Sequence, residues 1–378
     1  MDLNHIYLNN AATGWPKAPG VVDTISRVIQ SIPGGSGRSS AESNDNTDIL
    51  RRLLAEMLDT SDSSRICITH SATDALNMAI LGLSVPKGSL VVTTCMEHNS
   101  VLRPLNRLAE AGLIKLEIIP LDCSGSIDMS AYSDAITHKP YLVAVNHASN
   151  VTGRINDVEK LLGMARKAGA ITLLDASQSI GQIPVVVQLN ADLIAATVHK
   201  GLHGPVGVGF LYVAPELELD QIIVGGTGSR SDTNLHPFEM PMRLESGTPN
   251  EAAICGAITA IEWMLQNSDA FITNSHRLNT KLRNGLRQMD KVKIPGDDPE
   301  VESLGTVSFT IDGWNSNDLG YALESSFNIV CRSGLHCAPL IHKALLSYPE
   351  GAVRFSVSGF NTNGDIDTAI DALVKISQ

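Results

Sequence analysis

A cysteine in the segment 332–340, which reads RSGLHCAPL, could do chemistry in three different ways. Cys337 could be a buried structural thiol, which is the common state of a free cysteine. It could bind a metal with Cys331 and His336, although adjacent His and Cys residues are a poor spacing for zinc and no further pair completes a site. It could also be a nucleophile, because a glycine-containing loop with Arg332 and His336 nearby favours the thiolate. The segment alone leaves all three interpretations open.

A lysine stands at the end of an apolar segment in ADLIAATVHKGLHGP, residues 191–205. Lys200 follows a run of strand-forming residues and precedes a turn rich in glycine and proline. A lysine held at a strand end beside a loop can present its amine to a carbonyl cofactor. The alternative is a surface lysine that ends a strand, and this segment alone favours that alternative.

An aspartate ends a second apolar segment, AITLLDASQS, residues 170–179. Ligands of open α/β sheets bind at the carboxyl ends of the strands, so Asp175 and Lys200 are expected at one sheet edge. In an enzyme that uses pyridoxal phosphate (PLP), a carboxylate keeps the ring nitrogen protonated, which makes the ring an electron sink. Gln178 could reach the phenolic oxygen of that ring. The alternative role for Asp175 is a helix N-cap.

Small hydroxyl residues occupy a predicted strand-to-helix junction in THSATDALNMAI, residues 69–80. Backbone N–H groups at the helix start, together with the hydroxyls of Ser71 and Thr73, would bind a phosphate. Ser71 and Asp74 also have the spacing of a capping box, and the two interpretations are compatible.

Two further polar residues follow predicted strands. His98 lies in CMEHNSVL and Asn150 in NHASNVTG. An imidazole can stack on a pyridine ring and relay protons near neutral pH, and an amide can hydrogen-bond a ring oxygen. A lone histidine is usually structural, so the functional interpretation of His98 depends on its neighbours.

The elements that must position these residues alternate along the chain. Between about residues 65 and 215, nearly continuous apolar runs are separated by segments with helical spacing of apolar residues. This pattern predicts a mostly parallel sheet covered by helices on both faces. After about residue 250, a long helical stretch and then mixed strands and helices predict a smaller α+β domain. The segments 33–40 and 225–232, rich in glycine and serine, are expected to be loops.

Composition narrows the class of protein. The chain has 378 residues, of which 43% are hydrophobic, enough for two domains with a large core. A net charge of -12 argues against a nucleic-acid or anionic-membrane binder. The apolar runs are too short to span a membrane, and the N-terminal residues lack an apolar core of signal-peptide length. Six cysteines without a CxxC pair favour reduced thiols. We therefore expect a cytoplasmic protein without a metal site.

Nine motifs, spread in order over nearly the whole chain, resemble those of the class V aminotransferase superfamily, and within it those of cysteine desulfurases and selenocysteine lyases. They read NNAAT, SATDAL, MEHNSVL, SNVTG, DASQSIG, TVHKGLHGP, ESGTPN, RSGLHCAP and VRFSVSGFNT. Asn9 and Thr197 stand where many members carry aspartate and serine. The resemblance implies a PLP-dependent transferase of fold type I, with a mostly parallel seven-stranded sheet. It implies a large PLP-binding domain at 15–250 and a small domain made of 1–14 and 251–378.

The resemblance also implies a role for each site residue. Lys200 would bind PLP covalently, Asp175 would pair with the pyridine nitrogen, and His98 would stack on the ring. The other expected contacts, to the phenolic oxygen and the phosphate, come from Asn150, Gln178, Ala72, Thr73, Thr197, His199 and Thr248. Thr248 would reach the phosphate of a second subunit, which implies a homodimer. Arg354 would bind the substrate carboxylate through a bidentate fork, with Arg332 and Asn150 beside it.

The activity that follows from the resemblance is conversion of L-cysteine to L-alanine. The sulfur would pass to Cys337 as a persulfide and then to an acceptor protein. The nearest alternative is a selenocysteine lyase, or another PLP-dependent C–S lyase, in which Cys337 is auxiliary. An aminotransferase without an essential thiol is a more distant alternative. A non-catalytic scaffold is the last alternative, and the presence of Lys200, Asp175, Arg354 and Cys337 argues against it.

Overall fold

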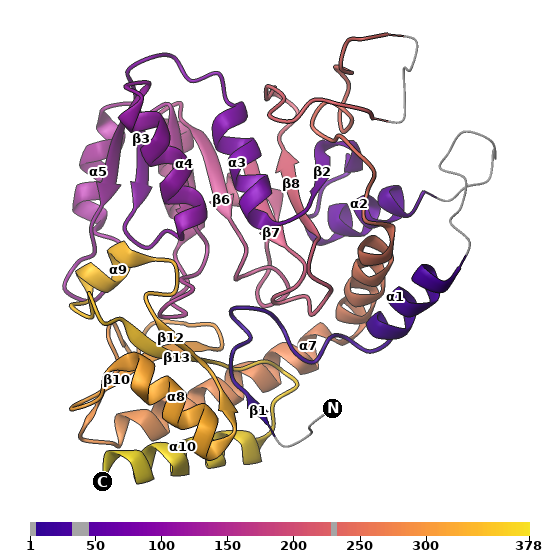
Figure 1. The fold of residues 1–378 in the computed structure, drawn as a ribbon. Coiled ribbons are helices and arrows are strands. Elements are labelled where there is room, and N and C mark those ends of the chain that lie inside the picture. Colours follow the sequence, from indigo (N-terminus) through magenta and orange to yellow (C-terminus); the bar gives the residue numbers. More distant parts are fainter. Residues whose placement is uncertain (1–4, 32–44, 228–232) are drawn as a thin grey trace.

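The computed structural model describes residues 5–31, 45–227 and 233–378 (Figure 1). The loop expected at 33–40 lies outside these residues, and so does most of the one expected at 225–232. Figure 1 shows one large sheet wrapped by helices and, below it, a smaller sheet with its own helices. In the described part of the chain, no helix combines the length and the apolar character needed to cross a bilayer.

The large sheet has seven strands in the order β2-β8-β7-β6-β5-β3-β4. Their bounds are β2 Ile66–Thr69, β3 Ser89–Thr94, β4 Ile114–Ile119, β5 Leu142–Asn146, β6 Ile171–Asp175, β7 Leu193–Thr197 and β8 Gly209–Val213. The pairs from β4 to β7 are parallel, and only β8 runs against its two neighbours. The prediction of a mostly parallel seven-stranded sheet is therefore confirmed.

Alternate residues of each central strand enter two separate apolar cores, one on each face of the sheet. In β7, Leu193 and Ala195 join one core while Ile194 and Ala196 join the other. Side chains of a strand point to opposite faces in turn, so a strand buried on both faces reads as a continuous apolar run. This is why the strands were recognisable in the sequence.

Different helices cover the two faces. Apolar residues of α3 (Ala72–Gly82) and α4 (Asn99–Glu110) belong to one core. The other core is shared by α2 (Asn46–Met57), α5 (Met129–Thr137), α6 (Val158–Lys167) and the first half of α7 (Glu251–Arg287). Single 3-10 turns lie at Ser63–Arg65 and Val187–Leu189. The α-helices that begin at Val21 and Pro339 have no side-chain cap, whereas the other α-helix starts carry polar caps. Two of these caps, Ser71 and His98, belong to the functional site.

The smaller part is built on an antiparallel sheet in the order β12-β13-β10-β9. Its strands are β9 Val292–Lys293, β10 Thr306–Ile311, β12 Arg332–Gly334 and β13 Ala352–Ser356, and its helices are α8 Ser316–Phe327 and α10 Asn363–Ser377. Near the N-terminus, β1 (Ile6–Tyr7) pairs in parallel with β11 (Ile329–Val330). Leu8 enters the same core as Phe309 and Phe355, so residues from both ends of the chain build this part together.

The long helix α7 connects the two parts. Its first half packs against α1 (Val21–Gln30) and α2, whereas Leu278, Leu282 and Leu286 near its end enter the smaller core. The expected domain boundary at residue 251 coincides with the start of this helix. The division at 15–250 remains a prediction.

Candidate active site

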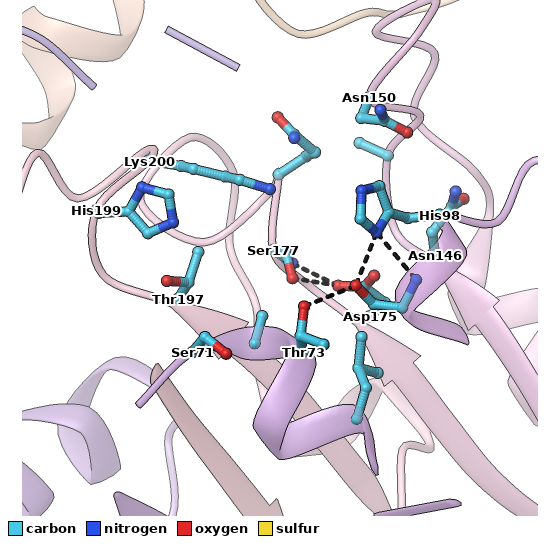
Figure 2. A pocket seen from close by; sticks show the side chains of 15 residues that line it. Ser71, Thr73, His98, Asn146, Asn150, Asp175, Ser177, Thr197, His199 and Lys200 are labelled. Atoms are coloured by element: carbon cyan, nitrogen blue, oxygen red, sulfur yellow. Dashed lines mark hydrogen bonds between the residues drawn. The ribbon is translucent and has the colours of Figure 1, made fainter. Parts of the chain in front are cut away.

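A cavity of about 530 Å³, part of it open to solvent, lies at the carboxyl edge of the large sheet (Figure 2). Lys200 follows β7, Asp175 ends β6, His98 follows β3 and Asn150 follows β5. Because these strands are parallel, their carboxyl ends meet at one edge and bring the side chains together. Further predicted cofactor residues line the same cavity, namely Ala72, Thr73, Gln178, Thr197 and His199.

The amine of Lys200 reaches into this cavity, as Figure 2 shows. The pKa of Lys200 is lowered to about 8, chiefly by burial; the carboxylate of Asp175 opposes this shift, and the charges of Arg354 and Arg332 add to it. A lysine amine with a pKa near 8 is partly neutral at physiological pH, so it can attack a carbonyl or accept a proton.

Asp175 is held by the turn that follows it. Its Oδ1 accepts a hydrogen bond from the backbone N–H of Ser177 at 2.9 Å and a second from the Ser177 hydroxyl. No helix begins directly after Asp175, so the alternative role of a helix N-cap is wrong, and the two bonds form a local turn instead. Both bonds engage the same oxygen, which fixes the orientation of the carboxylate in the cavity wall. Ser177 was not predicted from the sequence, although Asp-x-Ser is the spacing of an Asx turn.

His98 caps helix α4 with its ring. Its Nδ1 accepts from the backbone N–H of Ser100 at 3.1 Å, so the hydrogen-bond pattern assigns the ring proton to Nε2. The pKa of His98 is lowered to about 4, first by burial and then by the charge of Lys200. A neutral ring can stack on a flat cofactor without adding charge. The Ser100 hydroxyl lies 2.8 Å from both His98 Nδ1 and Thr73 Oγ1, a connection that sequence reasoning missed (Figure 2).

The start of helix α3 forms a cradle for an anion. Ser71 Oγ accepts from the backbone N–H of Asp74 at 3.1 Å, but the Asp74 carboxylate accepts from His70 N instead of Ser71 N. The predicted capping box is therefore only half formed. The first-turn N–H groups of a helix have no partners within the helix, and they carry its positive dipole end. The cradle is therefore suited to a phosphate.

A glycine of β8 packs directly under this helix start. A Cβ on Gly209 would lie 2.5 Å from the carbonyl carbon of Ser71 and 2.9 Å from the nitrogen of Ala72. Only glycine lets the strand approach the helix so closely. Thr197, which pairs with Gly209 across β7 and β8, donates to the carbonyl of Val208, and His199 Nδ1 lies 3.1 Å from Thr13 Oγ1.

Arg354 is a fully buried cation on β13. Its Nη1 donates to the backbone oxygen of Asn150 at 2.9 Å, its Nη2 donates to Asn9 Oδ1 at 3.3 Å, and its Nε has no partner. The pKa of Arg354 is lowered to about 9, first by burial and then by the charge of Arg332. Among the described residues, no carboxylate forms an ion pair with this guanidinium. A buried guanidinium without a carboxylate partner is suited to an anionic ligand.

Asn150 connects the cavity to the cysteine segment. Its Nδ2 donates to the backbone oxygen of His336 at 2.8 Å, and its buried Oδ1 has no partner. One N–H of the amide therefore anchors the segment, and the other remains for a ligand.

Cys337 is exposed, so the interpretation as a buried structural thiol is wrong. Its Sγ lies 3.6 Å from Nη2 of Arg332, and its backbone oxygen accepts from Asn99 N at 2.8 Å. The described residues contain no cluster of three or more His, Cys, Asp or Glu side chains that could hold a metal. By contrast, Cys331 is half-buried, and burial raises the pKa of its thiol to about 12.

The expectation that His336 favours the Cys337 thiolate is wrong. The His336 ring is buried, and burial together with Arg354 holds its pKa well below the usual range. His336 is therefore neutral, and Arg332 is the cation next to the sulfur.

Thr248 is the predicted cofactor residue that the structure does not bring to this cavity. It is exposed on a surface segment.

Comparison with known proteins agrees with this geometry. The family model described as aminotransferase class-V matches residues 6–368. A probable cysteine desulfurase of Methanothermobacter thermautotrophicus is 30% identical, over 99% of this chain and 95% of the relative. One from Pyrococcus abyssi is 32% identical, over 98% of this chain and 94% of the relative.

Solved structures give the same result. The apo structure of a cysteine desulfurase from Thermococcus onnurineus NA1 superposes with a TM-score of 0.91 at 31% identity, over 99% of this chain and 94% of that one. The Escherichia coli cysteine desulfurase CsdA, in its S-sulfonic acid form, has a TM-score of 0.88 at 26% identity, over 99% and 95% of the two chains.

Proposed function

Because the chain belongs to the class-V aminotransferase family and, within it, to the cysteine desulfurases, we propose that it converts L-cysteine to L-alanine and takes the sulfur onto Cys337. The observation that carries this proposal is the position of the thiol. Cys337 is exposed beside Arg332, on a segment that Asn150 ties to the cavity containing Lys200.

The residues of the cavity fit PLP. The helix α3 cradle suits its phosphate, and the neutral ring of His98 suits its flat face. Asp175 suits its ring nitrogen, and the unused N–H of Asn150 suits its phenolic oxygen, as does Gln178, which lines the same cavity. Lys200 would hold the cofactor covalently, and Thr197, His199, Ala72 and Thr73 would contact its phosphate. When bound, PLP stabilises negative charge at the α-carbon of an attached amino acid.

The chain's own groups supply the other steps. Arg354 would bind the carboxylate of L-cysteine, with Arg332 and Asn150 beside it. The Lys200 amine, once neutral, would accept the proton from the substrate α-carbon. The Cys337 thiolate would then attack the substrate sulfur. An S–S bond forms, the C–S bond breaks, and its electrons stay with the carbon, which is later protonated to give alanine.

We propose that two copies of the chain form a homodimer. The segment that contains Thr248 is edged by exposed apolar side chains, namely Ile222, Ile223, Val224, Leu235 and Phe238. Gly247 N donates to Gly226 O at 2.8 Å, so the segment that contains Thr248 lies beside the segment that contains Ile222, Ile223 and Val224. A second copy would cover the apolar residues and bring Thr248 to the partner's phosphate site.

Two further assignments belong to the proposal. The substrate would bind between a large domain, 15–250, that supplies Lys200 and Asp175, and a small domain, 1–14 with 251–378, that supplies Arg354 and Cys337. All six cysteines are free, which supports a reducing compartment such as the cytoplasm. There an acceptor protein would take the sulfur from Cys337.

Analysis of the cofactor and the products tests this function. The purified protein should be yellow and should bleach on borohydride reduction, and Lys200→Ala should lose the covalent link. Wild type should convert L-cysteine to alanine, and Cys337→Ala should not. Release of pyruvate instead of alanine would overturn the proposal. Loss of activity on L-cysteine but not on L-selenocysteine in Cys337→Ala would support sulfur transfer, and unchanged activity on both would support an auxiliary thiol.

A further inference from the structure

Three side chains form a hydrogen-bonded chain behind the cysteine segment. His336 Nδ1 lies 3.2 Å from His342 Nε2, and His342 Nδ1 lies 2.8 Å from the hydroxyl of Ser347. At the other end, His336 Nε2 lies 3.4 Å from the backbone oxygen of Arg332. The chain runs from half-buried Ser347 to Arg332, whose guanidinium contacts Cys337.

The backbone oxygen of Arg332, at one end of this hydrogen-bonded series, determines which atoms in the series donate and which accept. A backbone oxygen only accepts, so His336 Nε2 carries a proton toward Arg332. In a neutral ring Nδ1 then accepts, which requires His342 Nε2 to donate. His342 Nδ1 must in turn accept from the Ser347 hydroxyl at 2.8 Å, which is shorter than the 3.4 Å from that hydroxyl to the His342 backbone oxygen. Each ring has one donor and one acceptor in use, so the tautomers of both histidines are set.

Local backbone structure brings Ser347 onto His342. Helix α9 (Pro339–Ala344) is followed by Leu346 at a positive φ of 59°, which turns the chain back. The backbone N–H groups of Ser347 and Tyr348 both donate to the His342 carbonyl, at 2.9 and 3.1 Å. The Ser347 hydroxyl is thereby fixed over the imidazole.

The other end of the chain meets a strained turn. His336 and Cys337 have consecutive positive φ values of 51° and 57°, which residues with a Cβ adopt only when their surroundings enforce it. Asn150 holds the His336 carbonyl and Asn99 holds the Cys337 carbonyl. The turn is also closed by a hydrogen bond from Ala338 N to Leu335 O at 2.9 Å. The buried His336 ring is a further anchor, and His342 is its only side-chain partner among the described residues.

Burial, together with nearby positive charge, keeps both rings neutral. Burial and Arg354 lower the pKa of His342 to about 4, and the same two causes keep His336 uncharged. A neutral pair retains the single donor and single acceptor per ring that the chain needs.

We propose that His342, held by Ser347, is a positioning residue for Cys337. By orienting His336, it fixes the left-handed turn that keeps the sulfur beside Arg332. The importance of this turn for catalysis rests on the proposed function, in which Cys337 receives the sulfur. The positioning itself is a property of the folded chain and can be measured without turnover.

The test is the rate at which iodoacetamide alkylates Cys337, followed by mass spectrometry on the intact, folded protein. Exposed Cys123 serves as the internal reference in every sample. His342→Gln places an amide N–H near the position of Nε2, whereas His342→Asn places its polar atoms near Nδ1 and leaves His336 without a donor. We expect His342→Gln to stay within about twofold of wild type and His342→Asn to slow alkylation of Cys337 about fivefold, because the thiolate leaves Arg332. The alkylation rate of Cys123 should be the same in wild type, His342→Gln and His342→Asn.

Equal rates at Cys337 in wild type and both variants would overturn the proposal, as would faster alkylation in His342→Asn. If both His342 variants fail to fold, Ser347→Ala, at a half-buried position, replaces them. It should slow the alkylation of Cys337 about threefold, and a rate within about twofold of wild type would overturn the proposal.

Persulfide formation separates this inference from the proposed function. If the alkylation rates follow the expected order but L-cysteine leaves Cys337 unmodified, the positioning holds and the sulfur-transfer role fails. If Cys337 gains sulfur but its alkylation rate is the same in wild type and in the His342 variants, the proposed function holds and the positioning role fails.

Discussion

The sulfur of Cys337 lies 3.6 Å from Nη2 of Arg332, and Arg332 also faces the buried guanidinium of Arg354. Both arginines lower the pKa of Lys200, and negative charge on the Cys337 sulfur raises it. The side chains of Lys200, Arg332, Cys337 and Arg354 therefore influence one another electrostatically. Lys200 follows β7, whereas the other three come from β12, the turn after it, and β13. A cation at this distance can pair with negative charge on the sulfur when Cys337 reacts as a nucleophile.

Arg332→Ala should slow the reactions of Cys337. Without the cation, negative charge on the Cys337 sulfur is no longer stabilised, so the rate of its alkylation by iodoacetamide at neutral pH should fall about tenfold. Arg332→Lys should recover part of the loss, because it restores the charge without the planar fork. An Arg332→Ala protein that alkylates at the wild-type rate would show that the contact has no electrostatic effect.

Asn9→Asp should raise KM for L-cysteine more than it lowers kcat. Asn9 is the neutral side-chain partner of Arg354, and a carboxylate there would pair with the guanidinium and compete with the substrate carboxylate. We expect KM to rise about tenfold, measured by steady-state kinetics of alanine formation. The control is Asn9→Ser, which adds no charge. An equal KM in Asn9→Asp and wild type would contradict the role given to Arg354.

Asp175→Asn should leave the fold intact but remove most of the activity. The amide oxygen can still accept from Ser177, so the turn is retained. The amide cannot support a protonated ring nitrogen, so turnover should fall by about 100-fold or more. Circular dichroism checks the fold, and Ser177→Ala, which removes only the hydroxyl donor, should have a much smaller effect.

Lys200→Met should stabilise the cofactor-free protein at pH 7. The folded-state pKa of about 8 lies below the usual lysine value of 10.5, so the unfolded chain binds more protons between these values. The free energy of unfolding therefore rises with pH across this window, and below it the full cost of charging the buried amine is present. Methionine avoids that cost, with an expected gain of about 1–3 kcal/mol in urea unfolding at pH 7. The gain should shrink as the pH rises from 8 to 10, and a destabilised variant would contradict the burial of the amine.

Gly209→Ala should damage the phosphate cradle. The new Cβ would press on the backbone of Ser71 and Ala72, so helix α3 must move, at a cost of about 2–3 kcal/mol. PLP should also dissociate faster, as followed by loss of its absorbance. The matched control is Gly163→Ala in helix α6, where the nearest atom to a Cβ is the Asn190 side chain at 3.4 Å. That substitution should be neutral or stabilising.

The sequence predicted the large sheet and the residues at its carboxyl edge because both follow from local pattern. Leu193 to Ala196 are apolar on both faces, and Lys200 and Asp175 each stand where such a run ends. Parallel pairing then brings these ends together without further information. The family resemblance supplied the roles of Arg354, Thr248 and Cys337.

The details that the sequence did not predict depend on tertiary contacts. Asn9 and Arg354 meet across almost the entire length of the chain. The contact of His336 with His342 depends on a turn of two left-handed residues, which no helix or strand periodicity predicts. The burial of His336 likewise reversed its expected role, because a histidine next to a cysteine in sequence can point away from it in space.

The most direct test of the account is a single-turnover experiment with L-cysteine, stopped rapidly and analysed by mass spectrometry of the peptide that contains Cys337. The account predicts that this peptide gains the mass of one sulfur atom while one alanine is released, and that the peptides of Cys123 and Cys331 remain unchanged. Release of alanine with an unmodified Cys337 peptide, or sulfur carried on another cysteine, would contradict it.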